Sequence, residues 1–154
     1  MPARVGNVTG VEEDWRAQRA RAVEAHAAAY ARREAVESAQ AAELVADFAR
    51  RARERGLTST RLTARSYHGR GRYRTRLRGW YLNPARTLAV GEDGQFYLME
   101  ASGGFWAWLV GVDVSPSPPR LATGVGARDG ESVPLRTLLE RRLAAGDDWP
   151  APLL

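Results

Sequence analysis

Residues 11–55 follow a helical pattern of polar and apolar positions. Ala, Arg, Glu and Gln dominate this segment, and neither Gly nor Pro interrupts it. Its second half carries a stripe of apolar residues at steps of three and four, formed by Ala41, Leu44, Val45, Phe48 and Ala52. Thr9 suits the N-cap, and Gly56 suits the stop. We therefore expect a long N-terminal helix, either continuous or broken near Ser38.

The first half of this helix has a weaker apolar stripe. Its larger apolar residues are Trp15, Val23, Tyr30 and Val36, separated by many alanines. Burial of alanine contributes little apolar area, so this half either packs closely through small residues or meets a partner. No heptad pattern is sustained, which argues against a long coiled coil.

From residue 57 onward the pattern changes to a period of two, which is typical of strands. Asp93 and Gly94 separate two short apolar runs, and this dipeptide favours a hairpin turn. The run FWAWLVGVDV is rich in aromatic and branched residues, so we expect another strand there. Aromatic strand residues are usually buried, and we assign Phe105, Trp106 and Trp108 to the core. An exposed pair of tryptophans would instead indicate ligand stacking.

The C-terminal part predicts an extended link, a glycine-rich loop and a helix. The link is SPSPPR, and the loop covers residues 124–132. The helix has Ser132 as its N-cap and Pro134 in its first turn, and Gly146 ends it. Its buried side consists of Leu135, Leu138, Leu139 and Leu143.

Together these patterns predict an α+β fold. Its parts are the long N-terminal helix, a small, mostly antiparallel sheet of 4–6 strands, and a C-terminal helix. Residues 1–56 form the helical segment, and residues 57–154 form the sheet with the C-terminal helix. We expect one domain with the long helix packed on it, because 154 residues are the size of one ordinary domain.

Composition excludes several kinds of chemistry. The chain has no cysteine, so it has neither disulfides nor thiolate nucleophiles nor cysteine-based zinc sites. It has no lysine, which removes Schiff-base chemistry. Its apolar runs are far shorter than the ~20 residues of a membrane span, and we see no signal peptide. We expect a cytoplasmic protein without a membrane partner.

The arginines are unevenly distributed. Residues 57–90 hold eight arginines and no acidic residue, whereas residues 91–154 hold five arginines and nine acidic residues. Within the first block five arginines occupy alternate positions: Arg70, Arg72, Arg74, Arg76 and Arg78. On a regular strand they would share one face at a spacing of ~6.6 Å. Trp80 would continue that face, and Tyr73 would lie on the other.

This row favours a polyanionic partner. A guanidinium donates two parallel hydrogen bonds to a phosphate, and the neighbouring Tyr73 and Trp80 offer stacking surfaces for bases. We therefore predict a non-enzymatic module that binds nucleic acid with weak sequence specificity. An acidic protein surface is a second anionic partner that would fit. In the alternative reading the arginines are only a solvated face, and the Ala-rich helix binds a protein or its own copy as a homo-oligomer.

Other candidate residues carry weaker signals. His68 adjoins the arginine row, and Arg128 lies in the glycine-rich loop. Both would suit an anion site, and a small enzyme with a pocket near them is a third hypothesis. His26 and His68 are isolated, so the spacing predicts no metal site. We find no nucleophile motif and no paired carboxylates, and we expect no cofactor.

Overall fold

The structure is a computed structural model that describes residues 8–123 and 132–149. The described chain forms two compact units, which divide between Val36 and Glu37. The helix α1 (Val8–Glu54) supplies all of the first unit's described residues and residues 37–54 of the second. It is continuous through Ser38, so the predicted long helix has no break there. Thr9 lies inside this helix and is not its N-cap.

Residues 37–54 of α1 form one wall of the core, as the apolar stripe predicted. Val45 and Phe48 are almost fully buried, and the ring of Phe48 meets Trp80 edge to face at 6.0 Å between centroids. The helix ends where Gly56 adopts a φ of +69°, a left-handed conformation that glycine accepts at little cost.

A mixed five-stranded sheet follows, in the order β4-β3-β2-β1-β5. Neighbouring strands are antiparallel except β1 and β5, which are parallel. The strands are β1 (Thr60–Ser66), β2 (Arg72–Tyr81), β3 (Leu88–Gly91), β4 (Phe96–Leu98) and β5 (Glu100–Ala101). The predicted α+β class with a mostly antiparallel sheet is confirmed.

The sheet curls back on itself at Met99. Only this residue separates β4 from β5, so the two edges of the sheet are neighbours in the chain. The Met99 amide donates to the Thr87 carbonyl at 2.8 Å, and its carbonyl accepts from the Arg65 amide at 2.7 Å. Residues on the inner side of the curl form a small core cluster: Leu62, Ala64, Ala89, Tyr97 and Met99.

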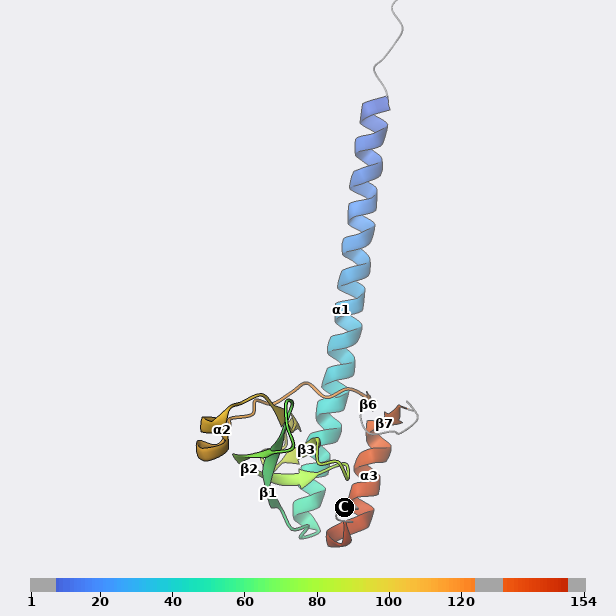
Figure 1. Ribbon diagram of the computed structural model, residues 1–154. Coiled ribbons are helices and arrows are strands. Elements are labelled where there is room, and N and C mark those ends of the chain that lie inside the picture. The colour runs from blue at the N-terminus through green and yellow to red at the C-terminus, as the bar shows by residue number, and fades with distance from the viewer. Residues whose placement is uncertain (1–7, 124–131, 150–154) are drawn as a thin grey trace, which may run out of the picture. The chain divides into compact units, whose positions relative to one another are not determined.

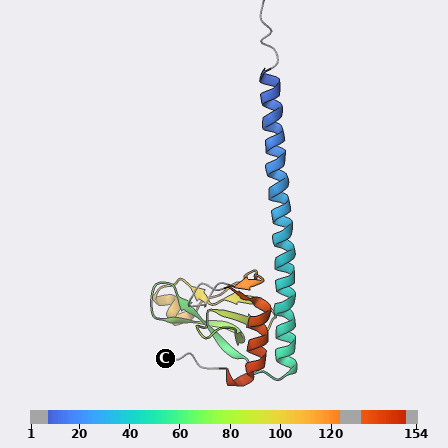
Figure 2. The same cartoon turned by 90° about the vertical axis from the view of Figure 1, so that its right-hand side faces the viewer.

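The larger core cluster joins the sheet to two helices. Residues 37–54 of α1 and the helix α3 (Leu135–Ala145) lie side by side and pack against Trp80, Leu82 and Leu88 (Figures 1 and 2). Leu135, Leu139 and Leu143 are buried there, which confirms the predicted apolar side of α3. Pro134, not Ser132, occupies its N-cap position, and a short 3-10 helix, η1 (Gly146–Asp148), follows it. The strands β6 (Ala122–Thr123) and β7 (Val133–Pro134) pair separately.

One predicted element is wrong. Residues 105–110 form a short helix, α2 (Phe105–Val110), and not a strand. Its aromatic side chains are exposed and lie outside both core clusters. The run has no alternation of polar and apolar residues, and glycines flank it on both sides. Within the second unit, Figure 1 shows α2 at the end of the sheet away from α3.

Candidate polyanion-binding surface

The row of five arginines is only partly realised on β2. The strand begins at Arg72, and Arg70 lies in the bend before it. Arg74, Arg76 and Arg78 are exposed, while Tyr73 and Thr75 between them are buried, which is the expected alternation. Four of the five arginines therefore lie on one strand, and they differ in their surroundings.

Arg72 is partly buried and forms hydrogen bonds within the protein. Its Nε donates to Thr63 Oγ1 at 2.7 Å, and its Nη2 donates to the Thr63 and Arg86 carbonyls at 2.8 and 2.9 Å. Its guanidinium also lies 5.9 Å from the centre of the Tyr81 ring. The Tyr81 hydroxyl accepts from the Thr63 amide at 2.7 Å. Side chains of β2 thus satisfy the backbone of Thr63, and Arg72 has a structural role.

Arg78 is also engaged within the protein. Its Nη2 donates to the Ser59 carbonyl at 3.0 Å, and its Nε lies 3.7 Å from a Glu92 carboxylate oxygen. Arg74 and Arg76 differ, because neither side chain forms an ion pair or hydrogen bond within the part of the chain that the structure describes. Their charges therefore have no partner among the described residues.

The predicted stacking residues of β2 are covered. Tyr73 is 6% exposed and Trp80 is 2% exposed, so neither ring presents a face to a base. Trp80 lies at an alternate position of β2 in step with the arginines. At its end of the strand, however, α1 covers the sheet. The pairing of β1 with β2 is also irregular, because three residues of β2, 75–77, lie opposite a single residue of β1, Leu62.

β2 anchors both ends of α2 instead. The Tyr73 hydroxyl donates to the Gly103 carbonyl at 2.5 Å just before the helix. The Arg74 carbonyl accepts from the Val112 amide at 2.9 Å just after it. Gly111 has a φ of +99°, and a Cβ there would lie 2.8 Å from the Arg74 carbonyl oxygen. Adjacent residues of β2 thereby fix α2 next to the arginines.

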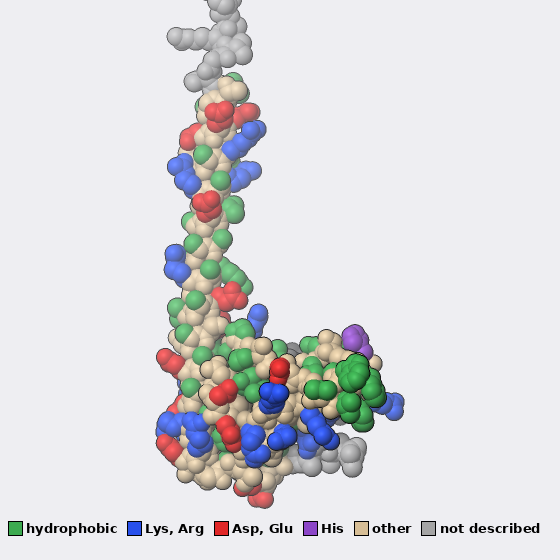
Figure 3. Space-filling view, turned by 90° about the vertical axis from the view of Figure 1, so that its left-hand side faces the viewer, with side chains coloured by type: hydrophobic (Ala, Val, Ile, Leu, Met, Phe, Trp, Pro, Cys, Tyr) green, Lys and Arg blue, Asp and Glu red, His purple; other side chains and the backbone are tan. Residues whose placement is uncertain are grey.

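A hollow of about 280 Å³ lies where α2 meets β2. Arg61, Arg74 and Arg76 line it together with Leu109 and Val110 of α2. One exposed carboxylate, that of Asp113, also lines it and forms no ion pair with these arginines in the described residues. Figure 3 shows green hydrophobic side chains gathered at this end of the domain beside blue arginines. Of the α2 side chains, Leu109 and Val110 line the hollow, and the exposed aromatic rings lie on the same short helix. We name the arginines of the hollow and these aromatic residues together the arginine–aromatic surface: Arg61, Arg74, Arg76, Phe105, Trp106 and Trp108.

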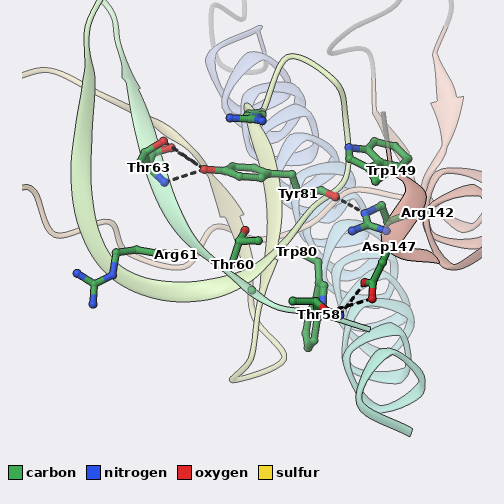
Figure 4. Close-up of a pocket in the computed structure, with 11 residues that line it drawn as sticks. Thr58, Thr60, Arg61, Thr63, Trp80, Tyr81, Arg142, Asp147 and Trp149 are labelled. Atoms are coloured by element: carbon green, nitrogen blue, oxygen red, sulfur yellow. Dashed lines mark hydrogen bonds between the residues drawn. The ribbon is translucent and has the colours of Figure 1, made fainter. Parts of the chain in front are cut away.

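A larger cavity of about 520 Å³ lies between β1, β2 and the end of α3 (Figure 4). Arg61 lines it as well, but the polar side chains at its other end, Thr58, Arg142 and Asp147, already have partners inside the protein. Arg142 donates to the Tyr81 carbonyl at 2.9 Å and lies 4.8 Å from the centre of the Trp149 ring. Asp147 accepts from the Thr58 amide at 2.8 Å and from its hydroxyl at 2.9 Å. These contacts tie α3 to the sheet.

Two charged groups in this cavity have shifted pKa values. Hydrogen bonds from the Thr58 amide and hydroxyl lower the pKa of Asp147, and the Arg142 charge adds to this effect. Burial lowers the pKa of Arg142, and the Asp147 carboxylate opposes that shift. Each of the two groups thus favours the charged form of the other.

Of the two weaker candidates, only His68 lies within the described residues. His68 is exposed, its ring meets Tyr67 at 6.5 Å between centroids, and its amide donates to Ser66 Oγ at 3.3 Å. Arg128 lies outside the described residues. Among residues 8–123 and 132–149, no group of acidic and histidine side chains is placed to hold a metal ion. None of the helices in those ranges is long and apolar enough to cross a membrane.

Comparisons with protein families, with curated proteins and with solved structures found no match to this chain. The function is therefore inferred from the site.

The sequence pattern pointed to Arg74 and Arg76 but not to Arg61, which the pairing of β1 with β2 brings beside them. It also placed the α2 aromatics in the core. The glycines on both sides of an unbroken apolar run were the available signal for a short separate element.

Proposed function

We propose that this protein is a non-enzymatic binding module for a polyanion, and that the polyanion is nucleic acid bound with weak sequence specificity. The observation that supports this most strongly is the arginine–aromatic surface. Three guanidiniums line one hollow without a carboxylate partner among the described residues. Like charges placed close together repel each other, and a phosphate chain relieves that repulsion while accepting paired hydrogen bonds.

The role of each arginine follows from its surroundings. Arg61, Arg74 and Arg76 contact phosphates, because their side chains are exposed and unpaired in the described structure. Arg72 stays with Thr63 and only supports the strand. Arg78 contributes less, because it is shared with Ser59 and Glu92. Contacts to phosphates carry no sequence information, so weak specificity is expected.

The test is the affinity for a labelled single-stranded DNA of mixed sequence, measured by fluorescence anisotropy at low salt. The double variant Arg74→Gln/Arg76→Gln should bind about tenfold more weakly, a loss of roughly 1.4 kcal/mol. The matched control is Arg32→Gln/Arg33→Gln, which removes the same charge from exposed positions of α1. An equal loss in both variants would mean that only net charge matters. Absence of binding by the wild-type protein would refute the proposal.

A second candidate function is protein interaction through residues 8–36. Within this unit Trp15, Val23 and Tyr30 are all more than 60% exposed. Large apolar side chains exposed together on a helix are typical of a surface that meets a partner. In this case the partner would be a protein or a second copy of the chain.

A further inference from the structure

The α2 helix exposes more apolar surface than any other short element among the described residues. Its exposed fractions are 70% for Phe105, 73% for Trp106 and 59% for Trp108. Leu109 and Val110 are 54% and 78% exposed. Within α2 only Ala107 is partly buried, and it lies next to Gly103. Exposure of this kind marks a binding surface, because water solvates it poorly.

The three aromatic rings of α2 lie close together, and each is exposed. Phe105 and Trp106 meet edge to face, with centroids 6.2 Å apart and planes at 72°. Phe105 and Trp108 lie 6.1 Å apart at 31°. Since β2 anchors α2 at both ends, the rings are presented from a fixed position. Rings that are already oriented lose less conformational entropy when they bind.

Charge decides which kind of partner fits. Leu109 and Val110 share their hollow with one carboxylate, Asp113, and with three arginines that have no ion-pair partner among the described residues, so the hollow favours a negatively charged occupant. A second copy of the same surface would bring the arginines of both copies together and is disfavoured. Amphipathic helices that lie in a lipid surface carry Lys or Arg on a polar face, whereas α2 has no charged residue at all.

We propose that α2 is a stacking platform for unpaired bases, which makes the partner a single-stranded nucleic acid. This inference rests on the proposed function and names its substrate class. Proteins that bind single strands combine a cationic groove for the backbone with aromatic rings on which bases stack. Duplex bases stack on one another and offer no free faces, so a duplex would contact the arginines alone.

The experiment compares Trp106→Leu/Trp108→Leu with the wild type. Leucine keeps the apolar character but cannot stack, and Trp106→Phe/Trp108→Phe restores an aromatic face. Trp15→Leu is the matched control, because Trp15 is exposed at a similar level outside this surface. The probes are one oligonucleotide as a single strand, the same sequence as a duplex, and vesicles that contain phosphatidylserine. Circular dichroism and urea denaturation check that each variant is folded.

The leucine variant should lose affinity for the single strand by roughly 5- to 150-fold for each stacked base. Its duplex affinity and its salt dependence should stay unchanged, and the phenylalanine variant should recover most of the loss. Equal binding of single strand and duplex, with no effect of leucine, would overturn the stacking inference and leave the polyanion proposal intact. Failure of the wild type to bind either nucleic acid would overturn both. Vesicle binding that depends on the tryptophans, without single-strand binding, would identify a lipid surface instead.

Discussion

Arg72 and Arg74 lie two residues apart on one strand, and we propose opposite roles for them: Arg72 supports the fold and Arg74 contacts phosphate. Substitution of each by alanine separates these roles in one experiment. Arg72→Ala should reduce stability and leave the affinity for single-stranded DNA nearly unchanged. Arg74→Ala should reduce that affinity and leave stability nearly unchanged. The prediction is informative because both variants remove the same charge and the same side-chain length.

The magnitude for Arg72 follows from its three hydrogen bonds. They end on Thr63 Oγ1 and on the Thr63 and Arg86 carbonyls, at 2.7 to 2.9 Å. Hydrogen bonds to charged groups contribute about 1.5–3 kcal/mol each in favourable cases, but the contributions are not additive and Arg72 is partly exposed. We expect Arg72→Ala to lower the free energy of unfolding by about 2–4 kcal/mol. Arg74→Ala should change it by less than about 0.5 kcal/mol, as is usual for an exposed unpaired side chain.

The assay is equilibrium unfolding in urea, followed by circular dichroism and by tryptophan fluorescence. Fluorescence follows the unfolding of the second unit through Trp80 of β2, which is buried against α1. Affinity for a single-stranded oligonucleotide is measured on the same preparations. If Arg72→Ala left the free energy of unfolding within about 0.5 kcal/mol of wild type, the structural role would be refuted. If it weakened binding as much as Arg74→Ala, the division of roles would be refuted.

Two further predictions concern other parts of the molecule. Burial, together with a 2.5 Å hydrogen bond from the Tyr97 hydroxyl to Asp93, raises the pKa of Tyr97 from 10.0 to about 12. The stabilisation from the protonated phenol is therefore complete below pH 10 and is lost between pH 10 and about 12. Over that range the difference in the free energy of unfolding between wild type and Tyr97→Phe, measured by urea denaturation, should disappear. If the first unit mediates self-association, Trp15→Ala/Tyr30→Ala should shift the sedimentation equilibrium toward monomer. A wild-type protein that is already monomeric at all concentrations would exclude self-association through this helix.

The sequence determined most of the fold because several signals agreed. The spacing of Val45 and Phe48, the stop at Gly56 and the turn at Gly94 each predicted what the structure shows. The curl of the sheet at Met99 was not predictable, because it depends on hydrogen bonds to strands far away in the chain. The pairing of β1 with β5 is non-local for the same reason.

The site was less predictable than the fold. The alternation of residues along the strand correctly predicted that Arg74 and Arg76 are exposed. It does not show which arginine forms hydrogen bonds within the protein. Arg72 donates a hydrogen bond to the Thr63 carbonyl, and the Thr63 amide donates to Tyr81. These bonds join two strands, so they cannot be predicted from the pattern of one strand. The helix α2 was misassigned because aromatic residues have strong strand propensity, and because burial is their usual state. The exposure of its side chains is a departure from that rule.

The central claim is that three arginines, which have no counter-ion among the described residues, contact the phosphates of a single strand. The most direct test is the slope of log K against log salt concentration for the wild-type protein and single-stranded DNA. Three contacts predict a slope near ~−2.1, so a fourfold increase in salt should weaken binding about 18-fold. A slope near ~−3.5 would mean that five arginines act together. An affinity that does not change with salt would contradict the account.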